Sequence, residues 1–247
     1  MIHWLVLPAS ACPDDVAQRS PGFLTAAERR VLAQLAFAKR RHDWLLGRWT
    51  AKCLLKRSLA AYRERPLAEI AVHNDPDGAP YLTVQGQGRL PLSISISHRD
   101  DRAFCALSTQ AIVGADIERV ETRAPAFVED FYTHGEAARV WACPPPERDT
   151  LVAVMWSAKE AVLKALRHGL RVDTRTVEIG HVEGIESGPV PPLSNAHPAP
   201  SGSWRRLHVA TTLEYTPPLA AWWAVSGEHV LTLAALPKTS AETEAGP

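Results

Sequence analysis

Several features that would indicate a function class at once are missing from this 247-residue sequence. Lysine plus arginine and aspartate plus glutamate both number 27, so the formal net charge is zero. A neutral chain offers no general electrostatic reason to bind nucleic acid. No apolar run approaches the ~20 residues that a membrane-spanning helix needs. We therefore expect a protein that contacts neither nucleic acid nor membrane.

Cysteine is scarce and dispersed, at Cys12, Cys53, Cys105 and Cys143. Without a Cys-x-x-Cys pair, neither a disulfide framework nor a zinc site is indicated, and reduced intracellular thiols are the simpler interpretation. The first eight residues, MIHWLVLP, carry no basic leader and predict a strand rather than a signal peptide. We expect a cytoplasmic protein.

Two carboxylates lie on one predicted strand, over residues 113–118 (VGADIE). Polar and apolar residues alternate there with period two, so Asp116 and Glu118 share a face and Ile117 points the other way. The two carboxylates are then roughly 7 Å apart along the chain. Their mutual repulsion is removed when a cation lies between them. A solvated strand edge is the ordinary alternative.

A second charged pair lies on a predicted helix that follows the prolines at 144–146 and contains residues 156–164 (WSAKEAVLK). Glu160 and Lys164 are four residues apart and share a face, whereas Lys159 points to a different side. Alone, this pair would be an exposed ion pair worth a few tenths of a kcal/mol. Added to the strand carboxylates, Glu160 completes an all-oxygen set of the kind that Mg²⁺ accepts.

The two segments together resemble a known family. Gly-Ala-Asp-Ile-Glu at 114–118, with Glu160 of Trp-Ser-x-Lys-Glu-Ala-x-x-Lys 44 positions after Asp116, resembles the paired signature of 4′-phosphopantetheinyl transferases. The spacing is similar to that of the larger, single-chain type related to the surfactin-synthetase activator.

The resemblance implies an α+β fold of two similar α/β lobes in a pseudo-two-fold arrangement, with the active site at the lobe interface. We expect an N-terminal lobe over 1–109, on the 3′-phosphate and adenine side of coenzyme A. A C-terminal lobe over 110–236 would carry the metal-binding and catalytic motifs, and 237–247 would be a flexible tail. No repeat is visible in the residues themselves.

Local patterns predict the elements within these lobes. Thr25 and Glu28 have the spacing of a capping box, and Gly169 is expected at the position just after the helix that carries Glu160. Residues 186–203 contain five prolines and predict a loop or flexible insert. Helices are expected over 25–38 and 40–61, and strands over 70–73, 81–84, 92–98, 102–108, 177–182, 204–211, 220–225 and 230–235.

Basic residues are concentrated on the helix expected over 40–61. Its segment RRHDWLLGR (40–48) is similar to the family's helix that meets the 3′-phosphate and adenine of coenzyme A. The resemblance implies that Arg48, with Arg40, Arg41 or Lys52, binds phosphate, for which the guanidinium fork is suited. A solvated helical face is the ordinary alternative for such a charge run.

Two further motifs extend the resemblance. Ile-Ser-His at 96–98 is similar to the family's third motif and implies that Ser97 and His98 contact the phosphates of coenzyme A, although a lone strand-end histidine is more often packed or solvated. In the turn Gly78-Ala79-Pro80-Tyr81, Ala79 stands where the family commonly has lysine, which makes Arg48 and its neighbours more important.

Glu136 belongs to a segment similar to the family's Phe-Phe-Thr-x-x-Glu element and opens a predicted helix. It is either an ordinary N-terminal acid stabilised by the helix dipole or a carboxylate near the acceptor hydroxyl. We assign as catalytic candidates Glu160, Lys164, Glu136 and His98, as coenzyme A-binding candidates Arg40, Arg41, Arg48, Ser97, His98 and Lys164, and as metal ligands Asp116, Glu118 and Glu160.

By resemblance, the chain transfers 4′-phosphopantetheine from coenzyme A to a serine of an apo acyl or peptidyl carrier protein, releases 3′,5′-ADP and uses Mg²⁺. Either Glu160 or Glu136 would accept the serine proton, and we expect a monomer. A different metal-dependent phosphoryl-transfer or nuclease enzyme and a non-catalytic coenzyme A-binding module remain as alternatives. The sequence does not indicate which carrier protein is served.

Overall fold

The computed structural model describes residues 1–12, 22–186, 203–213 and 218–238. Helices and strands both contribute, and the predicted α+β class is confirmed. The helices are α1 (Ala26–Gln34), α2 (Ala38–Ser58), α3 (Pro125–Phe131), α4 (His134–Ala142) and α5 (Pro145–Ala165). The strands are β1 (His3–Pro8), β2 (Ile70–Asn74), β3 (Pro80–Val84), β4 (Gly88–Arg89), β5 (Ser93–Arg99), β6 (Arg102–Ser108), β7 (Ala111–Arg119), β8 (Val177–Val182), β9 (Arg205–Thr211), β10 (Ala220–Ser226) and β11 (His229–Pro237).

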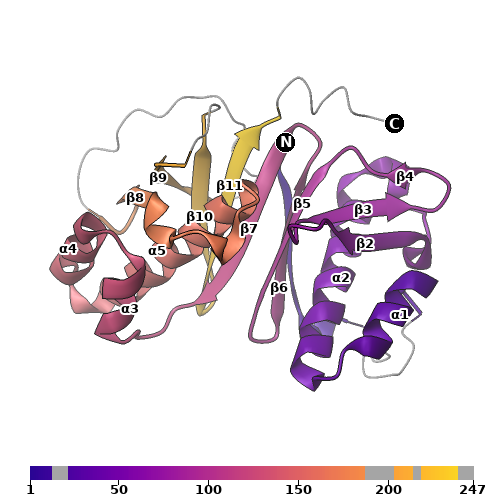
Figure 1. The fold of residues 1–247 in the computed structure, drawn as a ribbon, viewed down its shortest axis with the longest axis horizontal. Coiled ribbons are helices and arrows are strands. Elements are labelled where there is room, and N and C mark those ends of the chain that lie inside the picture. The colour runs from indigo at the N-terminus through magenta and orange to yellow at the C-terminus, as the bar shows by residue number, and fades with distance from the viewer. Residues whose placement is uncertain (13–21, 187–202, 214–217, 239–247) are drawn as a thin grey trace.

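Three antiparallel sheets organise these strands in the described part of the chain. Their strand orders are β1-β6-β5, β2-β3-β4 and β7-β11-β10-β9-β8. Figure 1 shows α1, α2 and the β2-β3-β4 sheet on one side, α3, α4, α5 and the strands β8 to β11 on the other, and β5, β6 and β7 between them. Each half therefore packs its own helices against its own strands.

The junction between the halves depends on serine side chains. The backbone N–H of Val113 donates to Ser93 Oγ at 3.0 Å, and that of Ala115 donates to Ser95 Oγ at 2.9 Å. These hydroxyls stand in for the main-chain carbonyls of an ordinary β-ladder, so β7 lies directly beside β5 although the two belong to different sheets. The alternation of serine and apolar residues in β5 thus gives one face to the junction and the other to the core.

Among the described residues, buried apolar side chains form two clusters in the first half, one in the second half and one that joins the halves. The residues of β6 alternate, so that Phe104 and Ala106 face the joining cluster while Cys105 and Leu107 face the first half. In β7, Val113, Ala115 and Ile117 also enter the joining cluster. The even-numbered residues of β7, which include Asp116 and Glu118, consequently face α5.

Most predicted elements are present, with a correction at each end of α5. The helix begins at Pro145, inside the proline run that it was expected to follow, because proline is tolerated in the first turn of a helix. The helix ends at Ala165, Leu166 is its C-cap, and the next residue is Arg167, whose φ is 61°. The N–H of Arg167 donates to the Lys164 carbonyl and that of His168 to the Leu163 carbonyl, as in a Schellman motif. Placing Gly169 just after the helix was therefore wrong, because the left-handed residue comes two positions earlier.

The predicted insert at 186–203 and tail at 237–247 lie almost wholly outside the described residues, which omit 187–202 and 239–247. Within the described ranges, no helix combines the length and the apolar character needed to cross a bilayer.

Candidate active site

Close contact between α5 and β7 brings the predicted carboxylates together. A methyl group at Gly114 would lie 1.8 Å from the carbonyl oxygen of Ala161. Only glycine therefore permits this approach of the helix to the strand. The same approach brings the Lys164 ammonium to 3.3 Å from the carbonyl oxygen of Ala115 and places the even-numbered face of β7 beneath the charged face of α5.

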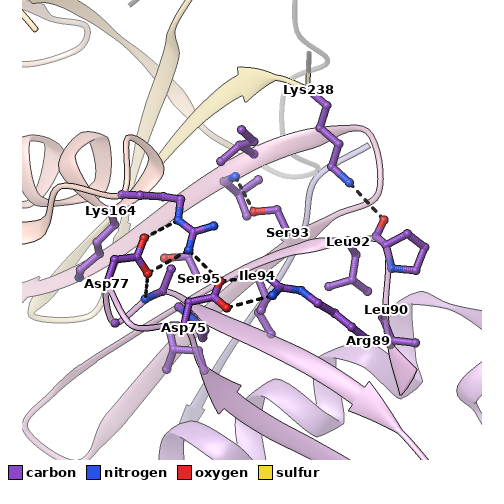
Figure 2. Close-up of a pocket in the computed structure, with 18 of the residues that line it drawn as sticks. Asp75, Asp77, Arg89, Leu90, Leu92, Ser93, Ile94, Ser95, Lys164 and Lys238 are labelled. Carbon is purple, nitrogen blue, oxygen red and sulfur yellow. Dashed lines mark hydrogen bonds and ion pairs between the residues drawn. The ribbon is translucent and has the colours of Figure 1, made fainter. Parts of the chain in front are cut away.

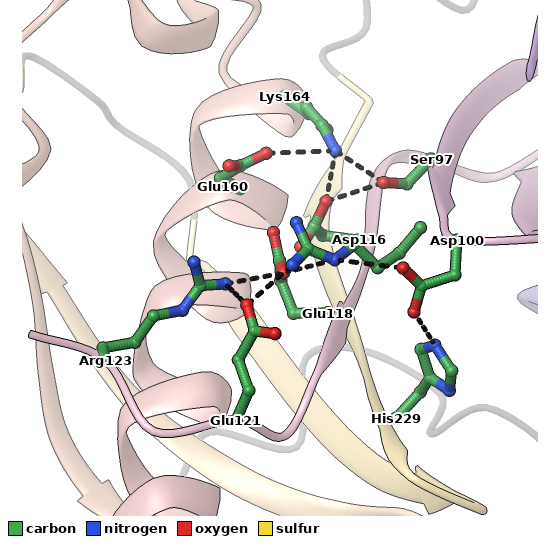
Figure 3. Close-up of polar contacts among 10 residues, drawn as sticks. Ser97, Asp100, Asp116, Glu118, Glu121, Arg123, Glu160, Lys164 and His229 are labelled. Carbon is green, nitrogen blue, oxygen red and sulfur yellow. Dashed lines mark hydrogen bonds and ion pairs between the residues drawn. The ribbon is translucent and has the colours of Figure 1, made fainter. Parts of the chain in front are cut away.

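Asp116 and Lys164 form the centre of the site (Figure 3). Lys164 Nζ is 2.5 Å from Asp116 Oδ1, and the Ser97 hydroxyl donates to the same oxygen at 2.7 Å. Lys164 also donates to Ser97 Oγ at 3.1 Å. Asp116 is only 2% exposed, and no described group hydrogen-bonds its Oδ2. A solvated strand edge, the alternative for this aspartate, is therefore excluded.

Glu160 joins the centre from the preceding turn of α5. Its Oε2 is 3.5 Å from Lys164 Nζ, so the two residues face each other as their spacing predicts. Burial, followed by the charges of Asp116 and Glu118, raises the pKa of Glu160 to about 7, although Lys164 opposes the shift. Burial alone would lower the pKa of Lys164, but the negative charges of Asp116 and Glu160 outweigh it, so the pKa of Lys164 is raised.

Two arginines that the sequence did not identify hold Glu118. Arg123 donates to Glu118 Oε2 at 3.3 Å, and Arg99 Nε lies 3.6 Å from the same oxygen. Both arginines also pair with Glu121, at 3.1 and 2.7 Å respectively (Figure 3). Burial and the charge of Asp116 nevertheless raise the pKa of Glu118. Arg123 follows Glu118 by five positions and Arg99 precedes it on β5, but no motif distinguishes either from the other arginines of the sequence.

The three predicted metal ligands are acidic neighbours, but they do not surround one point. In the described ranges, no group of three or more His, Cys, Asp or Glu side chains is arranged to hold a metal ion. The Lys164 ammonium lies between Asp116 and Glu160 and balances their charge. The donor chemistry still fits magnesium, since all three side chains offer oxygen and the buried Oδ2 of Asp116 lacks a partner among the described residues.

A cavity of about 640 Å³ beside α2 contains three of the predicted coenzyme A-binding residues. Arg40 and Arg48 line it from α2, and His98 lines it from the end of β5. Ser97, the residue before His98, instead points towards Asp116. The end of β5 therefore connects this cavity with the acidic centre.

Arg48 is held in the wall of that cavity. Its guanidinium lies 3.5 Å from the centre of the Trp44 ring, and its Nη2 is 3.5 Å from the carbonyl oxygen of Val72. Its Nε is 3.8 Å from Glu28 Oε1, and no described group accepts a hydrogen bond from this nitrogen. Burial lowers the pKa of Arg48 to about 10, against the opposing charge of Glu28. An anion in the cavity would supply the missing acceptor.

Two other basic candidates have different positions. Arg41 donates to the carbonyl of Leu32 at 3.0 Å and does not line the cavity. Lys52 is fully buried, where it donates to Glu28 at 2.6 Å and to the Phe23 carbonyl at 2.8 Å. The suggestion that Lys52 reaches a phosphate was therefore wrong, because the core already uses its charge.

A second cavity, of about 600 Å³, lies on the other side of the turn that contains Gly78 and Pro80, since both residues line both cavities. Lys164 lines it together with Ser93, Ser95 and apolar residues of β5 and β7 (Figure 2). Ala79, which replaces the family's usual lysine, also lines this cavity rather than the one beside α2.

Arg167 bridges the two halves beside this second cavity. Its guanidinium donates to Asp77 at 2.6 Å and to Asp75 at 2.7 Å, and both aspartates come from the turn after β2. Arg89 donates to Asp75 with both terminal nitrogens at 2.9 Å. These ion pairs fix the position of the Arg167 side chain between the two halves.

Glu136 is separated from the acidic centre by its own set of bonds. Glu136 is completely buried, and its Oε2 is 2.8 Å from Lys159 Nζ. Its Oε1 accepts from the N–H of Ile179 at 2.7 Å, and it closes a capping box with Thr133 at the start of α4. Lys159 is also completely buried, which confirms that it faces a different side of α5 from Lys164.

Part of the second half of the chain is similar to known proteins. Residues 112–214, which include all three predicted metal ligands, match the model of the 4′-phosphopantetheinyl transferase superfamily. The predicted family resemblance is confirmed. A 4′-phosphopantetheinyl transferase of Escherichia coli (strain K12), AcpT, is 31% identical over 127 residues. That similarity covers 51% of this chain and 57% of the transferase, so the chain spans little more than half the length of this relative.

Solved structures of superfamily enzymes resemble part of the chain only loosely. A holo-(acyl-carrier-protein) synthase from Bacillus anthracis, in complex with CoA (3′,5′-ADP), has 18% identity and a TM-score of 0.39. The superposition covers 53% of this chain and 99% of the synthase. The holo-[acyl-carrier-protein] synthase of Thermotoga maritima has 19% identity, a TM-score of 0.35, and coverage of 50% and 78% respectively.

Proposed function

We propose that this chain transfers 4′-phosphopantetheine from coenzyme A to a serine of an apo acyl or peptidyl carrier protein and releases 3′,5′-ADP. The observation that carries the proposal is the buried group formed by Asp116, Lys164 and Ser97 beside Glu160. This group lies between a cavity with arginine and histidine in its wall and a second cavity whose wall includes apolar residues of β5 and β7. The superfamily match over 112–214 supports the same activity.

The two cavities fit the two parts of coenzyme A. The anionic 3′-phosphate and the adenine suit the cavity beside α2, where Arg48 has a buried donor without an acceptor among the described residues. The uncharged pantetheine arm suits the second cavity, whose wall offers apolar side chains and serine hydroxyls and whose two aspartates are already paired with Arg89 and Arg167. The pyrophosphate would then pass the end of β5, where His98, Ser97 and Lys164 supply donors.

The reaction would need positioning and charge neutralisation more than covalent catalysis. The serine oxygen of the carrier protein attacks the β-phosphorus, a new P–O bond forms, and the bond to the bridging oxygen of 3′,5′-ADP breaks. Lys164, whose raised pKa keeps it charged, stabilises the negative charge that develops on the phosphate. Glu160 accepts the serine proton, for which a pKa of about 7 is well placed.

Magnesium belongs to the same proposal. Asp116, Glu118 and Glu160 would hold the ion, which would offset the charge of the pyrophosphate when bound. Burial and, after it, the charge of neighbouring carboxylates raise the pKa values of Glu118 and Glu160. The repulsion among the three carboxylates is the physical reason that a divalent cation would be attracted.

We also propose two similar lobes, 1–109 and 110–236, with the site at their interface, as in the larger, single-chain type of the family. The arrangement is supported by the serine-mediated junction of β5 with β7. A buried glutamate–lysine pair in each half, Glu28–Lys52 and Glu136–Lys159, supports their similarity. A cytoplasmic monomer is part of the proposal, and size-exclusion chromatography with light scattering would test the monomer.

The direct test is mass spectrometry of several apo carrier proteins after incubation with this chain, coenzyme A and Mg²⁺. The expected result is a mass gain of one phosphopantetheine on a carrier serine, dependent on both coenzyme A and the divalent ion. Full transfer in excess chelator would refute the metal requirement. Coenzyme A binding without transfer to any type of carrier protein would favour a binding module instead.

A further inference from the structure

The same buried network occurs once in each half of the chain. In the first half, Glu28 closes a capping box with Thr25, pairs with Lys52 at 2.6 Å and accepts from the N–H of Val72 at 3.0 Å. In the second half, Glu136 makes the corresponding bonds to Thr133, Lys159 and Ile179. All four charged residues are at most 3% exposed.

The sequence intervals of the two networks also agree. The strand residue that donates to the glutamate follows it by 44 positions in the first half and by 43 in the second. Each lysine also donates to the carbonyl oxygen found 15 residues after it, Leu67 at 3.2 Å and Thr174 at 3.1 Å. In both halves the network joins the short helix, the long helix and the first strand that follows them.

Each lysine lies beside residues of the proposed site on its own long helix. Lys52 comes one helical turn after Arg48, and the Glu28 carboxylate that binds Lys52 lies 3.8 Å from Arg48 Nε. Lys159 immediately precedes Glu160 and is five residues before Lys164. A change in the rotation or axial position of either helix would therefore move these side chains directly.

Building on the proposed function, we infer that the two pairs are positioning residues with separate tasks. Glu28–Lys52 holds α2 so that Arg48 meets the nucleotide part of coenzyme A. Glu136–Lys159 holds α5 so that Glu160 and Lys164 meet the reacting phosphate.

Lysine is suited to this task because its ammonium has three donors and no acceptor. Lys159 uses these donors on Glu136 and on the carbonyls of Thr174 and Val177. Lys52 uses them on Glu28 and on the carbonyls of Phe23 and Leu67. These bonds are shielded from water, so a rotated or shifted helix would leave a buried charge without its partners.

This role also separates Glu136 from the catalytic candidates. Its two oxygens already accept bonds from Lys159, Thr133 and Ile179, and it has no exposed surface through which to meet a carrier serine. Glu28 makes the same bonds in the half of the chain that lacks the acidic centre. The network therefore needs no proton-transfer role to account for it, which leaves Glu160 as the base.

The test compares two neutralised pairs, Glu28→Gln/Lys52→Met and Glu136→Gln/Lys159→Met. Replacing both members avoids a single uncompensated buried charge, so each variant is designed to fold. Ser157→Ala on α5 and Thr50→Val on α2 serve as matched controls, because each removes a buried hydroxyl bond on the same helix without altering a charge. The measurements are kcat and KM for transfer, calorimetric binding of 3′,5′-ADP without metal, and urea unfolding.

The second-half variant should lose on the order of 10²-fold in kcat while binding 3′,5′-ADP nearly normally. The first-half variant should bind 3′,5′-ADP about tenfold more weakly and raise KM for coenzyme A, with a smaller effect on kcat. The controls should lose stability without either kinetic change. The same pattern in both paired variants, or in the controls, would overturn the inference while leaving transfer by the wild-type chain intact. Absence of transfer by the wild-type chain would overturn the proposed function and, with it, the roles inferred here.

Discussion

Replacing Glu160 with glutamine should stabilise the metal-free protein although it removes the proposed catalytic base. The side chain is 17% exposed and lies among Asp116, Glu118 and Lys164. A rise in its pKa from 4.5 to about 7 corresponds to about 3 kcal/mol against the ionised form in the folded state. That net figure already includes the attraction of Lys164. Glutamine keeps the shape and loses the charge, so we expect a gain of about 1–3 kcal/mol at pH 8.

The sign of the pH dependence follows from the direction of the shift. Because the folded state holds the Glu160 proton more tightly than the unfolded state does, this residue contributes stability that is fully present below pH 4.5. The contribution is lost as the pH rises to about 7 and stays lost above it. The variant lacks this loss. The free energy of unfolding of the variant should therefore exceed that of the wild-type chain only slightly near pH 5, and the difference should grow until about pH 7.

Urea unfolding in chelator at pH 5, 6, 7 and 8, followed by the fluorescence of the eight tryptophans, measures this difference. Glu129→Gln is the matched control, since it replaces an exposed glutamate of α3 and should change stability by no more than about 0.5 kcal/mol. Parallel pH profiles for the Glu160 variant and the wild-type chain would refute the reasoning. So would a Glu160 variant that is less stable than the wild-type chain at pH 8.

Three further changes probe other parts of the site. Asp116→Asn removes the carboxylate that the lysine ammonium contacts at 2.5 Å, so urea unfolding should reveal a loss of about 3–5 kcal/mol, and an unchanged midpoint would contradict the central ion pair. Arg48→Ala should weaken binding of coenzyme A far more than binding of dephospho-coenzyme A, as measured by calorimetry. Arg41→Ala should leave the ratio of the two dissociation constants unchanged. Equal weakening of both ligands by Arg48→Ala would contradict a role of Arg48 at the 3′-phosphate. Gly114→Ala introduces a contact of 1.8 Å with the carbonyl of Ala161 and should destabilise the chain by about 1–3 kcal/mol or more; a wild-type melting temperature would contradict the close approach of the helix.

The loss of stability expected for Asp116→Asn would not follow if the three carboxylates only repelled one another. In that view, removal of any one of them leaves the metal-free chain as stable as before or more so. Asp116 instead carries the shortest contact to Lys164, whereas Glu160 lies 3.5 Å from it. Periodicity predicts which residues share a face. Which carboxylate pairs most closely with the Lys164 ammonium depends on how closely α5 approaches β7.

Local sequence patterns predicted the elements of the fold well, since they depend on neighbouring residues. The strand over 177–182 is found with those bounds, and the capping box of Thr25 and Glu28 is present with both of its bonds. The end of α5 was misplaced because a glycine was preferred for the left-handed position. Arg167 occupies this position instead, where its side chain pairs with Asp75 and Asp77, which are about 90 residues away in the sequence.

The segment at 156–164 illustrates how far the site could be predicted. Spacing alone indicated that Lys159 and Lys164 face different sides, and the structure confirms it. Spacing did not indicate that Lys159 has a buried carboxylate partner, because Glu136 belongs to another helix and its motif suggested a place near the substrate. The first half supplies the missing information: Glu28 and Lys52 make the same bonds where no acidic centre exists. The two halves therefore share a repeated set of hydrogen bonds and ion pairs, although no repeat is visible in the residue types. Comparing the two sets distinguishes the side chains that hold the helices from those proposed to face the phosphate.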